Sequence, residues 1–220
     1  MTAVSLAHRH DHASVATIGR ELVGLLAPAC ARVEIAGSVR RRVRQVKDLE
    51  IVVLAKWGER PATQSSLFAA AVEPYNLLHS RVLQLRADGV LETLKTGTTT
   101  HVPWTPKPDG KQWRLHFEGV DVDLFLAQPE SWGVTLWQRT GSAKTHTGAN
   151  GFVPNCLARW KALQAGQARL QDNLFIDGRG HRHACATEAE VFALLRMPFI
   201  EPPRREDANL PRAFPLDWRP

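Results

Sequence analysis

Apolar positions along the first half of the chain switch between helical and extended spacing. They recur every three to four residues over 14–28, which predicts an amphipathic helix that Pro28 ends. Two short apolar runs, residues 32–36 and 49–55, predict strands, and the second is apolar enough to be mostly buried. Residues 63–80 follow a helical pattern again. This order predicts a sheet with helices packed against it.

The middle of the chain carries the clearest alternation. Residues 100–119 contain two extended segments around a Pro-Asp-Gly-Lys turn signal, which predicts that these segments pair as a hairpin. Residues 120–127 read Val-Asp-Val-Asp-Leu-Phe-Leu-Ala. A strand over this run places Asp121 and Asp123 on one face and apolar side chains on the other.

Beyond residue 128 the predicted elements become shorter and more loop lies between them. A helix or loop ending in Thr-Gly-Ser is followed by a short basic helix, a small hairpin and a helix that begins with a capping box, and the tail reads as Pro-rich loop. These segments cover residues 129–146, 152–166, 172–186 and 187–195. The chain is therefore predicted to be α+β, with a mixed sheet and helices through about residue 128 and a smaller α+β unit after it.

Composition limits the cellular compartment and the kind of binding partner that we expect. The 220 residues contain no apolar stretch of membrane-spanning length, and the first residues lack the apolar core of a signal peptide. Three isolated cysteines indicate a reducing compartment, so we expect a cytoplasmic or nucleoid-associated protein that is not secreted. A net charge of +6, mostly from Arg, favours a polyanionic partner. A GC-rich genome, whose codons favour Arg, is the alternative explanation.

Asp48 and Glu50 interrupt the most apolar predicted strand and leave it on the same face. Burying two like charges costs several kcal/mol unless cations compensate them. Together with Asp123 from a second strand they make an oxygen-rich site suited to Mg²⁺ or Mn²⁺. Two such ions about 3.5–4 Å apart steady both oxygens of an in-line phosphoryl displacement. The alternative is that the acidic pair lies at a strand end and faces water.

Gly37 and Ser38 stand where the first predicted strand ends and a short helix begins. Glycine lets a ligand approach the backbone, and Ser with the exposed helix N–H groups binds phosphate. The run Arg40 to Arg42 follows directly, and one of these side chains is suited to fold back onto the same phosphates. A solvated basic helix face is the alternative for the arginines.

Taken together, these motifs resemble a known superfamily. The pattern apolar-Gly-Ser, nine residues, Asp-apolar-Glu-apolar is similar to the signature of polymerase-beta-type nucleotidyltransferases. Residues 122–142, Val-Asp-Leu through Thr-Gly-Ser, resemble the third-carboxylate strand and the next segment of family X DNA polymerases. Residues 91–104 and 187–207 are similar to a palm strand and the end of the thumb in that family. The resemblance covers roughly residues 13–207.

The resemblance implies a polymerase-beta-like palm over residues 31–130 and a thumb-like unit over 131–220, with residues 1–30 as a helical remnant of the fingers. It also implies a reduced enzyme, without the lyase and phosphoesterase domains found in other members.

Site residues follow from the resemblance position by position. Asp48 and Glu50 match the pair that bridges both metal ions, and Asp123 matches the acid that activates the primer 3′-hydroxyl. Nucleotide-binding positions are matched by Gly37, Ser38, Arg41, Gln138, Arg139, Thr140, Gly141 and Ser142.

This chain also departs from the family. Gln138 and Arg139 replace two aromatic residues that contact the nucleotide sugar, Glu50 stands where the polymerases usually have Asp, and His146 replaces an Asn that touches the base. The departure at residues 138–139 puts discrimination between deoxy- and ribonucleotides in doubt.

Basic and aromatic residues of the C-terminal unit give weaker signals. Arg159, Lys161 and Arg169 are predicted to track DNA phosphates, with a solvated basic face as the alternative. Trp137 and Trp160 fit core packing better than base stacking. Histidines near the N-terminus, and His181 with His183, are predicted to be surface residues.

The sequence thus predicts a DNA-directed DNA polymerase of family X type that fills short gaps during DNA repair. It uses two Mg²⁺ ions, or Mn²⁺, a dNTP and a primer-template or gapped DNA, and we expect a monomer without membrane contact. One alternative is a template-independent or ribonucleotide-using nucleotidyltransferase of the same superfamily. Another is a non-catalytic nucleic-acid-binding module.

Overall fold

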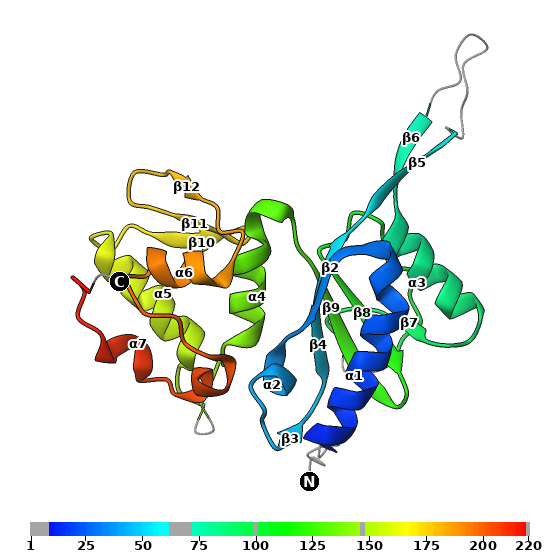
Figure 1. Ribbon diagram of the computed structural model, residues 1–220, viewed down its shortest axis with the longest axis horizontal. Helices are drawn as coiled ribbons and strands as arrows, with labels where there is room; N and C mark the ends of the chain where they lie inside the picture. Colours follow the sequence, from blue (N-terminus) through cyan, green and yellow to red (C-terminus); the bar gives the residue numbers. More distant parts are fainter. Residues whose placement is uncertain (1–8, 62–71, 99–100, 146–147, 219–220) are drawn as a thin grey trace.

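A mixed five-stranded sheet forms the N-terminal part of the protein (Figure 1). The computed structural model describes residues 9–61, 72–98, 101–145 and 148–218. In spatial order the strands are β2 Cys30–Ile35, β4 Leu49–Ala55, β9 Val120–Leu126, β8 Gln112–Phe117 and β7 Glu92–Leu94. Strands β4 and β9 are parallel, and the other neighbours pair antiparallel. The α+β class predicted from the sequence is confirmed.

Two helices, α1 His12–Leu26 and α3 Leu77–Ala87, bury their apolar faces against one face of this sheet. Asp11 caps α1 by accepting a hydrogen bond from the N–H of Ala13 at 3.0 Å, and the short 3₁₀ turn Ala27–Ala29 follows the helix. The helix predicted over residues 14–28 is thereby confirmed. The core that results includes Val15, Leu22, Leu49, Ile51, Leu78, Val82, Val122 and Leu124.

The prediction of a helix over residues 63–80 is wrong at residues 72–76 and confirmed at residues 77–80. Residues 62–71 lie outside the described part, and β6 Val72–Asn76 pairs antiparallel with β5 Trp57–Pro61. Helix α3 begins only at Leu77, because the Asn76 side chain accepts a hydrogen bond from the His79 N–H at 3.0 Å and caps it. A second small pair joins β1 His10–Asp11 to β3 Gln45–Val46.

The predicted hairpin across residues 100–119 is also wrong. A turn does form at 108–109, but β8 pairs with β9 on one side and β7 on the other. The β8–β9 connection is a two-residue turn, Glu118-Gly119, in which both residues have positive φ. Such turns match the twist of a hairpin, so the stronger local signal was Glu-Gly rather than Pro-Asp-Gly-Lys.

The C-terminal part packs around its own core. Its helices are α4 Trp132–Thr140, α5 Phe152–Leu163, α6 Glu188–Leu194 and α7 Leu210–Ala213. The sheet of this part consists of β10 Arg169–Gln171, β11 Leu174–Ile176 and β12 Arg182–His183. A short 3₁₀ segment, Pro129–Ser131, precedes α4. Another, Pro202–Glu206, lies in the tail together with α7, so the tail is more regular than the predicted loop. Thr187 caps α6 as expected from the capping box.

Helix α4 lies between the two parts (Figure 1). Its Trp132 and Leu136 pack with Ala36, Val52 and Phe125 on the sheet face opposite α1 and α3. This second face is the one that carries the acidic residues of β4 and β9, so α4 brings the C-terminal part next to them. The boundary at residue 130 stays a prediction. No helix among the described residues is long and apolar enough to cross a membrane.

Candidate active site

The register of the sheet brings the predicted acids to one face. Glu50 is the cross-strand partner of Asp123, and Asp123 in turn pairs with Arg114 on β8. Because strand side chains alternate, Leu49, Ile51, Val122 and Leu124 go to the core while Glu50, Asp123 and Arg114 share the opposite face. Asp48 comes immediately before β4 rather than within it. The alternative, an acidic pair at a strand end, is therefore right in the position of Asp48. The charge of Asp123 nevertheless acts on Asp48, so this acid belongs to the same group.

The charges of Asp48 and Asp123 act on the neighbouring carboxyl groups. Burial and then the Asp48 charge raise the pKa of Glu50 to about 7, and Asp123 adds to the effect. Burial and then the Asp123 charge raise the pKa of Asp48 above its usual value. Gln112 donates a hydrogen bond to Asp123 Oδ1 at 3.1 Å. The site accumulates negative charge that the surrounding protein compensates only in part.

Arg139 is one of the protein cations whose charge acts on these acids, beside Arg41, Arg114 and Lys47. Its guanidinium carbon lies 3.8 Å from the centroid of the Phe125 ring, and burial lowers its pKa while the charges of Glu50 and Asp123 act to raise it. Its Nε, like Gln138 Oε1, is buried without a hydrogen-bond partner among the described residues. The residue predicted to face the nucleotide sugar thus lies beside the acids with donor capacity unused.

The turn that leads from β2 into α2 Gly37–Arg40 is folded around Glu50. The Ala36 N–H donates to the Glu50 carbonyl at 2.8 Å, and Gly37 adopts φ +62. A Cβ at Gly37 would lie 2.1 Å from Glu50 Oε2. The glycine is therefore required by the neighbouring carboxylate, a reason that the sequence did not indicate.

Replacing Gly37 by Ala tests this packing. We expect Gly37→Ala to destabilise the fold by about 2 kcal/mol, because a left-handed backbone disfavours a Cβ and the Glu50 carboxylate must move. Gly89→Ala is the matched control, since Gly89 has φ +71 with open space around the missing Cβ. Urea denaturation of both variants separates the two causes. Equal losses of stability would contradict the contact with Glu50.

Arg41, predicted to bind phosphate, is engaged elsewhere in this structure. Its Nε donates to Glu206 and its Nη1 to the Thr140 carbonyl at 2.7 Å, although its charge still acts to lower the pKa of Glu50. The structure therefore ties Arg41 to the tail of the chain. Binding of a triphosphate by Arg41 stays a prediction and requires exchange of the Glu206 carboxylate for phosphate oxygens.

A buried ionic cluster that the sequence did not indicate joins the two parts beside this turn. Arg40 donates to both carboxylate oxygens of Glu188, at 2.9 and 2.7 Å, and to Thr140 Oγ1 at 2.8 Å. Arg205, fully buried, donates to the same Glu188. Burial alone would raise the pKa of Glu188, but the hydrogen bond from Arg40 and the Arg205 charge outweigh it and lower that pKa.

The predicted nucleotide-contacting turn, residues 140–142, is a hub of internal contacts. Thr140 and Ser142 are buried; the Ser142 hydroxyl donates to the Arg205 carbonyl at 2.9 Å and accepts from the Phe152 N–H at 3.0 Å. A Cβ at Gly141 would lie 2.5 Å from Val153. The turn positions α4 and Arg139, and its contact with nucleotide stays a prediction. His146 lies outside the described residues.

The prediction for Arg159 is wrong. This side chain is only 6% exposed, and its guanidinium donates to five backbone carbonyls, those of Leu195, Arg196, Pro211, Phe214 and Pro215. It fastens the end of the chain to α5 and has no face left for DNA. The core placement of Trp137 and Trp160 is confirmed, since both are buried. Lys161 and Arg169 are exposed, and their DNA contact stays a prediction.

The donor set of the three acids fits a hard divalent ion in type and charge, since carboxylate oxygens are what Mg²⁺ prefers. The raised pKa values of Asp48 and Glu50 indicate that extra positive charge is favourable there. Their spacing is open: the only three potential metal ligands of the described residues whose donor atoms all lie within 4.8 Å are His101, His116 and Asp121. The acids therefore do not close into a single-ion cage.

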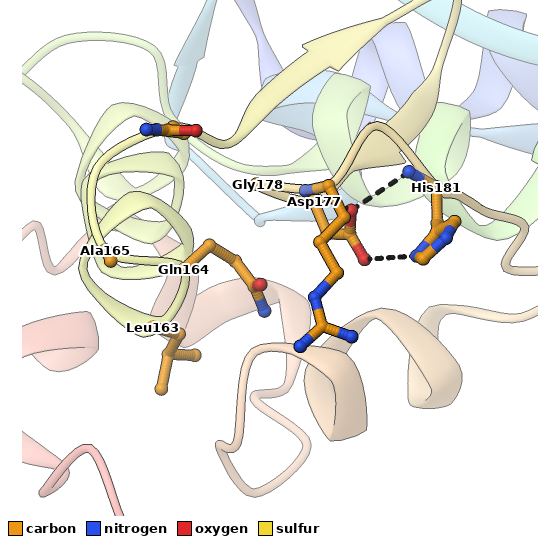
Figure 2. A pocket seen from close by; sticks show the side chains of 8 residues that line it. Leu163, Gln164, Ala165, Asp177, Gly178 and His181 are labelled. Atoms are coloured by element: carbon orange, nitrogen blue, oxygen red, sulfur yellow. Dashed lines mark hydrogen bonds and ion pairs between the residues drawn. The ribbon is translucent and has the colours of Figure 1, made fainter.

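Two surface hollows of similar volume differ in what they adjoin. One, of about 520 Å³, lies between the end of α5 and the loop after β11 (Figure 2), and none of the three acids lines it. The other, of about 500 Å³, lies between the sheet, α4 and the β10–β11 turn. Gln112 and Arg139 line it, and Lys111 spans its rim through a 2.7 Å ion pair with Asp172. The second hollow is the one that opens beside the candidate site.

Comparison with known proteins adds no assignment to this geometry. No family model matches the chain, and no curated protein gives a significant match to it.

Proposed function

We propose that this protein is a nucleotidyltransferase of the family X DNA polymerase type, which extends a primer 3′ end by two-metal catalysis in short-gap repair. One observation carries the proposal: Glu50 and Asp123 pair in register on neighbouring parallel strands, and Asp48 joins them in one electrostatically coupled group. Structural ion pairs also perturb carboxyl pKa values. Here, however, the pKa values of Asp48 and Glu50 stay raised although the charges of Lys47, Arg114, Arg41 and Arg139 act to lower them.

Each residue has a role in the proposed reaction. Asp48, Glu50 and Asp123 would hold the Mg²⁺ ions, which supply charge neutralisation for the attacking and leaving oxygens. Asp123 faces the primer 3′-hydroxyl and orients it. Arg139, already beside Glu50 and Asp123, adds a fixed positive charge near the nucleotide. The hollow lined by Gln112 and Arg139 receives the nucleotide.

Primer extension tests the proposal. We expect the untreated protein with Mg²⁺ or Mn²⁺ to add dNTPs to a gapped duplex at least about tenfold faster than to an unpaired single strand. Absence of incorporation with either metal would contradict the proposal and favour a non-catalytic nucleic-acid-binding module. Equal extension of paired and unpaired primers would contradict its templated form.

Arg139 and Gln138 keep a second candidate open, a ribonucleotide-using or template-independent enzyme of the same superfamily. Arg139 stands at a position where the family has an aromatic side chain. Its guanidinium stacks over the Phe125 ring and offers hydrogen-bond donors in place of an apolar ring. Donors at a sugar-contacting position favour a 2′-hydroxyl over hydrogen. The same assay with rNTPs decides: a higher kcat/KM for rNTPs than for dNTPs favours the second candidate.

Binding of duplex DNA is expected to involve exposed cations of the C-terminal part. We expect the double variant Lys161→Ala/Arg169→Ala to bind gapped DNA several-fold more weakly and to lower the slope of log K against log salt by about 2. Arg20→Ala/Lys107→Ala removes the same charge from other exposed positions and serves as the control. Fluorescence anisotropy at several salt concentrations measures both; identical slopes for the two double variants would contradict this assignment.

A further inference from the structure

A second group of metal-ligating side chains lies on the same sheet, apart from the three acids. His101 Nε2 and His116 Nδ1 each lie 2.9 Å from the same oxygen, Asp121 Oδ1. The three donor atoms all lie within 4.8 Å of one another, which no other group of three achieves in the part of the chain the structure describes. The group combines two imidazole nitrogens with one carboxylate oxygen, a different chemistry from the all-carboxylate site.

Regular structure fixes the positions of these side chains. His116 on β8 is the cross-strand partner of Asp121 on β9, two residues from the tight Glu118-Gly119 turn. The His101 segment is held against β7 by backbone bonds from Lys95 to Val102 at 2.8 Å and from Trp104 to Thr93 at 2.9 Å. The two imidazole centroids are 4.6 Å apart. The donors converge because the sheet places them there rather than because mobile side chains meet by chance.

Arg114 supports the carboxylate from behind. Its Nη2 donates to the other oxygen, Asp121 Oδ2, at 2.6 Å, and its Nη1 donates to the Thr98 carbonyl at 3.3 Å. The bond to Oδ2 turns Oδ1 toward the two histidines. Carboxylates that ligate metals are commonly oriented in this way by a hydrogen bond to their second oxygen.

Asp177, His181 and His183 form a similar group of one carboxylate and two imidazoles, but their donor atoms do not converge on one point. Asp177 Oδ2 also lies near two rings, at 3.1 Å from His181 Nδ1 and 3.2 Å from His183 Nε2, and Figure 2 shows its contacts with His181. Its Oδ1 is occupied by the N–H groups of Arg179 and His181. The donor atoms of this cluster do not all come within 4.8 Å, and the carboxylate serves the turn instead.

We propose that His101, His116 and Asp121 form a binding site for a transition-metal ion of the Zn²⁺ class. Two imidazoles and one carboxylate are a ligand set that Zn²⁺ and Co²⁺ accept, and water completes four-coordination. Binding replaces the two imidazole contacts with Asp121 Oδ1 by three metal–ligand bonds. The site is independent of the proposed polymerase activity, and it differs from the Mg²⁺-type site in its ligands.

Titration of the untagged, metal-free protein with Co²⁺ tests the proposal, because four-coordinate Co²⁺ gives strong visible absorption bands. We expect one four-coordinate Co²⁺, seen by its absorption band, that Zn²⁺ displaces. His116→Gln and His101→Gln are each expected to weaken its binding at least about tenfold. His183→Gln is the matched control from the other cluster and leaves binding unchanged. Asp123→Asn also leaves it unchanged, which separates this site from the three acids.

Four results would overturn the site. They are no four-coordinate band in the wild type, a band that persists in both His101→Gln and His116→Gln, a band lost in Asp123→Asn, and a band lost when His8 and His10 are both replaced by Gln, which would place the ion at the N-terminus. None of these results bears on primer extension, so the two proposals fail separately.

Discussion

Asp123→Asn is expected to lower the rate of nucleotide addition by at least about 10³-fold, corresponding to about 4 kcal/mol of transition-state stabilisation. Asp123 is the acid assigned to the primer hydroxyl and faces Glu50 across the parallel strand pair. An amide at this position keeps the size of the side chain and an oxygen for the Gln112 hydrogen bond. It lacks the negative charge needed to hold a divalent ion. Single-turnover primer extension on a gapped duplex measures the change.

The same substitution separates catalysis from folding. Asp123 adds to the charge repulsion that raises the pKa values of Asp48 and Glu50, so the metal-free variant is expected to melt no lower than the wild type. Asp88→Asn, an exposed change at the end of α3, controls for the chemistry of the substitution. A variant that melts normally and retains its rate would remove the basis for the proposed active site.

The acidic strands were predictable because period-two alternation is a local signal. An apolar strand interrupted by Asp48 and Glu50, and a second strand carrying Asp123, are readable from a few residues each. No local signal predicts that these two strands are neighbours, because the parallel β4–β9 pairing joins segments about 70 residues apart. The prediction that they are neighbours came from the family resemblance. Once the strands are neighbours, the register that pairs Glu50 with Asp123 follows from burying Ile51 and Leu124 on the other face.

The errors have physical causes of the same kind. Residues 72–76 carry a helix-compatible pattern, yet cross-strand pairing with β5 holds them extended, a long-range contact that propensity does not include. Arg159 looked like a surface cation because Arg usually is one. Its burial depends on five backbone carbonyls, all of them more than 35 residues away, which the sequence order does not bring together.

The ion pairs that join the N-terminal and C-terminal parts were also not predictable from the sequence. Arg40 and Arg41 belong to one short basic run, but the fold divides their partners between Glu188 at the start of α6 and Glu206 in the tail. Arg40 and Arg41 therefore link the turn between β2 and α2 to the C-terminal part, instead of forming a solvated basic face. The acids of the C-terminal part hold both arginines beside Thr140.

Glu50→Gln is expected to stabilise the metal-free protein at pH 8 by about 3 kcal/mol. Burial and then the Asp48 charge raise the pKa of Glu50 from 4.5 to about 7, and 1.36 kcal/mol corresponds to each unit of difference from the unfolded chain. With the folded pKa above the unfolded one, the folded protein binds the extra proton between about pH 4.5 and 7. Its stability therefore falls as pH rises through that window.

Urea denaturation from pH 4 to 8 tests this stability change. The variant and the wild type are expected to be nearly equal in stability below about pH 4.5, and to diverge progressively up to about pH 7. Glu92→Gln, an exposed change on β7, is the control and produces no such divergence. A gap independent of pH would mean that Glu50 is ionised at no cost in the folded protein. Burial and the Asp48 charge disfavour the ionised Glu50 carboxylate. Millimolar Mg²⁺ is therefore expected to stabilise the wild type, and to stabilise Glu50→Gln much less, so that the difference in stability between the two becomes smaller.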